Sequence, residues 1–251
     1  MKTIFNFAPA IAVACFSLTA CHNDSPEITD GHGLISPAVE LLSADDEAED
    51  LSRAEGNVTV ADLALNITSA DGSYNNTWES INDYDPATAF APGVYSVSVA
   101  YGDNNTEGFD VPAYFAEKNI TVEKGKETHV SLKARLTKAM VSVTYTDSFK
   151  AYMDSYSATL TTADNSIVFA QDEARAAYVK PGDNTVNVTF KTPAGGPKTQ
   201  QVASFAAVPH HHYHVKVDMN DGAGSGVAKI IVTLDDSLEY EDVIIELNDK
   251  N

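Results

Sequence analysis

Apolar and polar residues alternate along most of this chain, and the alternation restricts the folds that it can adopt. Leu63, Leu65 and Ile67 are separated by Ala64 and Asn66. The same pattern returns in the segments 95–101, 130–136, 139–145, 186–190 and 213–219. Successive side chains of a strand point to opposite faces, so a period of two predicts strands with one buried face. A helical period is sustained nowhere, and the sequence predicts an all-β protein.

Short turn signals separate the alternating segments. They include Asp71-Gly72, Pro92-Gly93, Lys124-Gly125 and the loop 193–197. Strands at this spacing are typical of β-sandwiches, and 251 residues suffice for two ordinary domains. We therefore expect two tandem immunoglobulin- or transthyretin-like β-sandwiches, at 31–136 and 137–251.

The N-terminus has the pattern of a secretory signal. A single Lys2 precedes an apolar run from Ile4 to Leu18, which is shorter than the ~20 residues that a membrane-spanning helix needs. The run ends in Leu18-Thr19-Ala20-Cys21, the pattern of a bacterial lipobox, in which the thiolate of Cys21 would take the lipid. An ordinary signal peptide with a chance cysteine is the alternative. We predict a signal peptide at 1–20, a lipid on Cys21 and a polar tether at 21–30.

The charge of the chain excludes several partners. It has 16 basic and 36 acidic residues, a formal net charge of −20. Nucleic-acid binders need a basic surface, and anionic membranes repel an acidic one. Attachment to the membrane would therefore depend on the lipid of Cys21, at ~0.8 kcal/mol for each buried methylene group. Cys15 would leave with the signal, so we expect no disulfide in the mature protein.

An acidic stretch at 45–50 is followed by Arg53. Contiguous acids favour a solvated loop over a cation site, because their carboxylates seldom converge on one ion. Ser52-Arg53-Ala54 offers an exposed basic site for proteolytic processing, although an ordinary loop residue is the simpler interpretation of Arg53. A cut there would free a groove that accepts a strand from a partner protein.

Several short stretches together resemble one family. They are Gly31-His32-Gly33-Leu34, the strand 63–68 with its turn, Pro92-Gly93-Val94-Tyr95, the loop 108–115, and Leu136 followed by Met140-Val141-Ser142-Val143. This combination resembles an uncharacterised Bacteroidales lipoprotein family, domain of unknown function 4493. Ala116 departs from the glycine expected after the aromatic pair. The resemblance implies a fimbrillin-like layout of two sandwiches at the cell envelope, with no catalytic residues to carry over.

The histidine-rich stretch 210–214 is a candidate metal site. On a strand, His212 and His214 would project to the same face and could hold zinc with a third ligand from elsewhere. Lys216 on that face disfavours a cation, and no Cys or spaced Glu completes the set. A solvent-facing strand rich in histidine is the simpler interpretation.

Three aromatic residues form a candidate glycan-binding site. Tyr74, Trp78 and Tyr84 lie in one polar stretch, and exposed rings stack on sugar C–H surfaces. The competing interpretation places Trp78, the single tryptophan, in the core of the first sandwich.

Sequence motifs of catalysis are lacking. There is no Gly-x-Ser-x-Gly elbow, phosphate loop or His-Glu-x-x-His motif, and no carboxylate pair stands out by its spacing. We therefore expect a protein without enzymatic activity or cofactor, anchored in the outer membrane and exposed at the cell surface. The predicted function is a fimbrillin-like adhesion or structural module whose partners are pilus or other envelope proteins. A surface glycan-binding protein associated with polysaccharide utilisation is the alternative.

Overall fold

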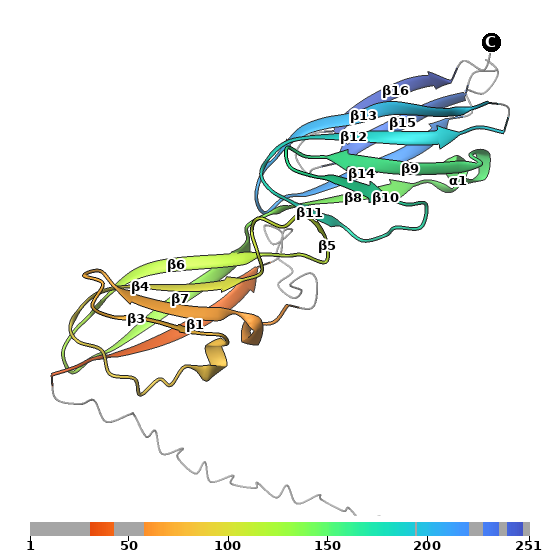
Figure 1. Ribbon diagram of the computed structural model, residues 1–251. Helices are drawn as coiled ribbons and strands as arrows, with labels where there is room; N and C mark the ends of the chain where they lie inside the picture. Colours follow the sequence, from red (N-terminus) through yellow and green to blue (C-terminus); the bar gives the residue numbers. More distant parts are fainter. Residues whose placement is uncertain (1–30, 43–57, 194, 221–227, 236–239, 248–251) are drawn as a thin grey trace, which may run out of the picture.

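The computed structural model describes residues 31–42, 58–193, 195–220, 228–235 and 240–247. Figure 1 shows two halves built of strands and lying end to end, joined at a narrow junction. Within the described residues, the one α-helix is the short α1 (Asp147–Tyr152). The all-β prediction and the tandem sandwiches are confirmed.

The first half contains one six-stranded sheet in the order β1-β7-β6-β4-β2-β3. Its strands are β1 (Leu34–Leu42), β2 (Ala64–Ser69), β3 (Asn75–Trp78), β4 (Gly93–Tyr101), β6 (Tyr114–Val122) and β7 (Glu127–Leu136), with 3-10 turns η1 (Val60–Asp62) and η2 (Ile81–Asp83). β6 pairs with β7 at only two positions, so β1 and β7 fold over the remaining strands. Ile35, Val97 and Leu132, from both parts of the sheet, meet in one buried core.

The second half is a sandwich of two sheets. One is β10-β9-β12-β13 and the other is β16-β15-β14-β8-β11-β5. Their strands are β5 (Gly108–Phe109), β8 (Ala139–Tyr145), β9 (Ser155–Thr161), β10 (Ser166–Phe169), β11 (Ala177–Val179), β12 (Gly182–Lys191), β13 (Pro197–Ala207), β14 (His212–Asn220), β15 (Ala228–Asp235) and β16 (Tyr240–Leu247). Val143 and Val215 of the second sheet pack with Leu160 and Val188 of the first.

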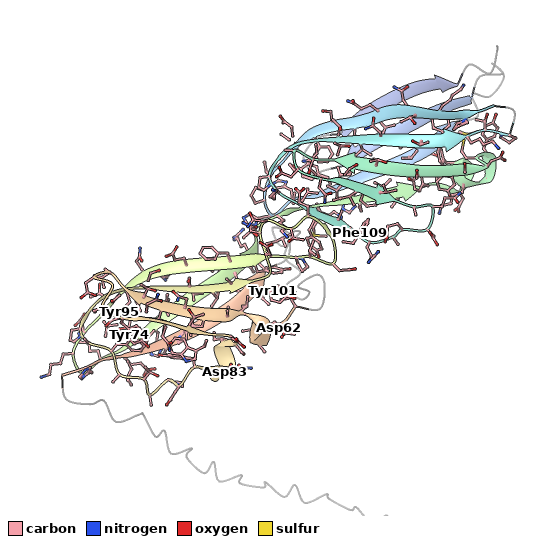
Figure 2. All side chains as sticks on the ribbon, in the orientation of Figure 1. Asp62, Tyr74, Asp83, Tyr95, Tyr101 and Phe109 are labelled. Carbon is pink, nitrogen blue, oxygen red and sulfur yellow. The ribbon has the colours of Figure 1, made fainter. Side chains whose placement is uncertain are left out.

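One segment of the first half completes a sheet of the second. β5 precedes residue 137 in the chain, yet it pairs antiparallel with β11. The ring of Phe109, which Figure 2 labels at the junction, meets the Phe169 ring edge-on at 5.1 Å. Met140 and Tyr178 in turn belong to the core of the first half. The domain boundary expected at 136/137 stays a prediction. Residues on each side of it in the sequence pack in the other half of the molecule.

Candidate functional site

The strand β1 is the first candidate site, because it lies at the edge of its sheet. Each residue from Leu34 to Leu42 has a partner in β7, and the pairing is parallel, unlike every other pairing in this sheet. Pro37 lacks an N–H group, which suits an edge position. In the described part of the chain, no strand pairs with the other edge of β1; only the isolated bridge Gly33–Phe90 precedes it.

Buried side chains and specific hydrogen bonds hold the start of β1. Ile35 is fully buried, and its carbonyl accepts a hydrogen bond of 2.8 Å from the Tyr84 hydroxyl. Gly33 and Phe90 exchange two backbone hydrogen bonds of 2.9 Å. A Cβ atom on Gly33 would lie 2.4 Å from the carbonyl oxygen of Glu123, so only glycine fits there. β1 is therefore an edge strand that also fills the core.

The predicted lipidation and processing sites lie outside the described residues. Cys21 is in the segment 1–30, and Arg53 is in the segment 43–57 that follows β1. Both remain predictions.

The three aromatic residues of the predicted glycan site do not form one exposed face. Trp78 and Tyr84 meet edge-on at 5.0 Å. Tyr74 instead packs against Phe90 and against Tyr95, beside which Figure 2 shows it. Tyr84 is only 7% exposed, and burial raises its pKa well above the ordinary value. Tyr74 and Trp78 are half-buried against the same core. A sugar-binding role stays a prediction. Of the three rings, Trp78 and Tyr74 are the two that are partly exposed to solvent and could contact a sugar.

His212 and His214 lie on the same face of β14, and their ring centroids are 3.7 Å apart. His214 Nδ1 is 3.0 Å from the Ser142 hydroxyl, and the exposed Lys216 follows on the same face. Across the part of the chain that the structure describes, no group of three or more His, Cys, Asp or Glu side chains could hold a metal ion. Zinc binding by this pair stays a prediction without a third ligand.

A cluster of polar side chains at the junction between the halves was not predicted. The buried Lys138 ammonium donates to the carbonyls of Thr106 at 2.6 Å and Val111 at 2.7 Å. Burial lowers the pKa of Lys138, and the nearby carboxylates of Asp103 and Glu107 oppose that shift. An ammonium ion held by two carbonyls of the preceding loop ties the segment 102–113 to the start of β8.

Glu107 makes the second connection of this cluster. Its carboxylate accepts hydrogen bonds from the backbone N–H of Lys180 at 2.8 Å and from the Thr162 hydroxyl at 2.7 Å. Arg175 stacks over the Phe109 ring at 4.8 Å and pairs with Asp110. These residues are far apart in sequence, and no local pattern marks them.

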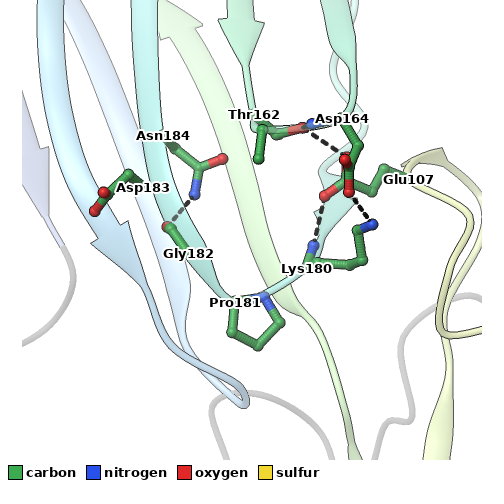
Figure 3. A pocket seen from close by; sticks show the side chains of 9 residues that line it. Glu107, Thr162, Asp164, Lys180, Pro181, Gly182, Asp183 and Asn184 are labelled. Atoms are coloured by element: carbon green, nitrogen blue, oxygen red, sulfur yellow. Dashed lines mark hydrogen bonds and ion pairs between the residues drawn. The ribbon is translucent and has the colours of Figure 1, made fainter.

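A polar pocket with a volume of about 240 Å³ opens beside Glu107 (Figure 3). The Lys180 ammonium pairs with Asp164 at its rim, which raises the pKa of Lys180. The complete lining is Glu107, Thr162, Ala163, Asp164, Lys180, Pro181, Gly182, Asp183 and Asn184. The first half contributes Glu107 and the second half contributes the rest.

Among the described residues, no helix is both long and apolar enough to cross a membrane.

The geometry defines a class: a β protein of two sandwiches with a parallel edge strand at its start. A fimbrial assembly protein from Parabacteroides distasonis ATCC 8503 has a similar structure, with a TM-score of 0.50 and 11% identity over 82% of this chain and 97% of that one. The fimbrial anchor protein Mfa2 from Porphyromonas gingivalis matches with a TM-score of 0.39 and 12% identity, over 86% and 100% of the two chains. No curated protein matches.

The sequence places the chain in one family. Residues 33–249 match the family described as Domain of unknown function (DUF4493), and the chain belongs to it. The predicted family resemblance is thereby confirmed.

Proposed function

We propose that this protein is a non-enzymatic adhesion or structural module of the fimbrial type, exposed at the cell surface. Its fold, shared with a fimbrial assembly protein, supports this function. The observation that carries the proposal is β1, an edge strand that nevertheless fills the core of its domain. Its partners would be other pilus or envelope proteins.

Removal of β1 would leave a site shaped for another strand. A cut after Arg53 would separate residues 31–53 from the rest of the domain. The edge of β7 from Glu127 to Arg135 would then lose its partner, and the space filled by Ile35 would open. Unpaired backbone groups and exposed apolar surface both favour the addition of a strand from another protein.

Limited proteolysis tests this proposal. An arginine-specific protease should cut the native protein after Arg53 first, leaving a mature N-terminus at Ala54 by mass spectrometry. Electron microscopy of the cut protein, incubated with envelope extract, should then show filaments or larger assemblies. Arg53→Lys keeps the charge but removes the cleavage site, so it is the matched control. A native protein that resists the protease, or a cut protein that stays monomeric, would contradict the proposal.

The proposed position at the outer membrane depends on lipid at Cys21. Mass spectrometry of the mature protein should find an acylated N-terminal cysteine, and Cys21→Ser should release the protein from the membrane fraction. Protease treatment of intact cells should degrade it, because a surface protein is accessible. Protection from protease would show that it faces the periplasm.

Glycan binding is the second candidate function, and the half-buried ring of Trp78 is the feature that favours it. A glycan array would detect it, with Trp78→Ala compared with Tyr101→Phe. Binding that survives the loss of the indole would remove this site.

A further inference from the structure

The polar pocket at the junction contains a buried hydrogen-bond acceptor without a partner. Asn184 is 1% exposed, and its Nδ2 donates to the Gly182 carbonyl at 2.8 Å. Its Oδ1 is also buried and accepts no hydrogen bond. Figure 3 shows that oxygen directed toward Thr162, away from Gly182. A buried acceptor in this state destabilises the protein unless a donor reaches it.

The charges that line the pocket favour a cation. Glu107 and Asp164 contribute two carboxylates, whereas Lys180 contributes the one ammonium group, which already pairs with Asp164. The carboxylate of Asp183 lies on the opposite side of β12 from the Asn184 side chain (Figure 3). The pocket therefore has a formal excess of one negative charge, and acceptors outnumber donors. An entering group that both donates hydrogen bonds and carries positive charge satisfies these surroundings.

The lining also argues against a sugar. None of the pocket residues is aromatic, so no ring is available to stack on a pyranose. An alkylammonium group is compact, carries three donors and brings a flexible apolar stem. Its volume is small compared with the pocket, which leaves room for the stem and for water.

We propose that this pocket binds an alkylammonium group, from a lysine side chain of a partner protein or from a free polyamine. The ammonium donates to Asn184 Oδ1 and to the Glu107 carboxylate. Because Glu107 belongs to the first half and Asn184 to the second, an occupied pocket also strengthens the contact between the halves. This site is separate from β1, and its test is independent of the proposed strand exchange.

Titration of the full chain tests the site with three probes. Nα-acetyl-lysine methylamide represents a protein side chain, spermidine represents a free polyamine, and Nα-acetyl-norleucine methylamide is the uncharged control. The side-chain amide signal of Asn184 in ¹⁵N NMR spectra is the readout, with calorimetry for affinity. We expect saturable shifts with at least one amine and none with the norleucine compound. Whichever amine binds identifies the source of the ammonium group.

Two variants in the pocket and one outside it complete the test. Asp164→Asn should weaken amine binding about threefold to fivefold, as expected for loss of one solvent-exposed charge at the rim. Asn184→Asp should tighten it, and Asp172→Asn, an exposed acid outside the pocket lining, should leave it unchanged. The proposal is overturned if neither amine moves the Asn184 signal, if the uncharged control binds equally, or if Asp164→Asn has no effect. Saturation by Ca²⁺ with no response to either amine would also overturn it.

Discussion

The hydroxyl of Tyr84 donates a hydrogen bond of 2.8 Å to the carbonyl oxygen of Ile35, and both residues are buried. Ile35 lies on the edge strand β1, whereas Tyr84 lies directly after η2. The bond therefore joins an edge strand to a turn 49 residues away. It is a specific restraint on the strand whose release we propose.

Tyr84→Phe should destabilise the first half by about 1 kcal/mol, because it leaves the Ile35 carbonyl without its donor. Urea unfolding followed by tyrosine and tryptophan fluorescence would measure the change. Tyr101→Phe is the matched control, since the Tyr101 hydroxyl makes no hydrogen bond with any of the described residues. If strand exchange occurs, Tyr84→Phe should also speed the release of the cut N-terminal piece. Equal stabilities of the two variants would contradict the role of this bond.

Gly33→Ala should destabilise the protein by about 1–3 kcal/mol, the range for forcing extra atoms into a packed site. The new Cβ would lie 2.4 Å from the carbonyl oxygen of Glu123 and 2.9 Å from that of Lys126, so the backbone directly before β1 must move. Gly93→Ala, at the start of β4, is the control, because its Cβ would meet its nearest neighbour at 3.9 Å. Thermal unfolding of both variants would measure the difference. If Gly33→Ala is as stable as Gly93→Ala, the backbone at residue 33 can shift at little cost, and the prediction is wrong.

Lys138→Met should weaken the connection between the halves. The change removes the donor of two carbonyls, at a cost of about 2 kcal/mol, and should split urea unfolding into two transitions. Lys133→Met is the control; its exposed ion pair with Glu40, at 3.7 Å, should contribute no more than about 0.5 kcal/mol. A single transition of unchanged midpoint in Lys138→Met would contradict this interpretation.

His210 should make stability depend on pH. Burial holds the pKa of His210 below its ordinary value of 6.5, and the charges of Arg135 and His211 act in the same direction. The unfolded chain therefore binds a proton more readily, so stability falls as the pH falls from about 6.5 through the lower pKa of the folded state. His210→Asn should reduce this fall, and asparagine tolerates the backbone φ of 70° at this position. Urea unfolding at pH 7.5 and at pH 5 would measure the free energy of unfolding of the wild type and of His210→Asn. An equal decrease in the two proteins would contradict the prediction.

The strands were predictable because their pattern is local. Leu63, Leu65 and Ile67 are all fully buried, as the period of two requires. The same reasoning placed His212 and His214 on one face, where their rings do meet.

Contacts between distant segments were not predictable. Glu107 lies in what looks like a polar turn, yet its carboxylate binds Lys180 and Thr162 of the other half. Lys138 looks like a linker residue and is buried. Nothing in the neighbouring residues marks either one, because their partners lie 27 to 73 positions away in the chain.

The strand pairing and hydrogen bonds between the segment 102–113 and the second half affect how the molecule responds to force. Tension along the chain would be shared between the covalent link at Thr137-Lys138 and the pairing of β5 with β11. The halves could swing apart only after β5 detaches and Glu107 leaves its two donors. Under moderate pull the molecule should therefore behave as a stiff rod, and a hinge should appear only at higher force.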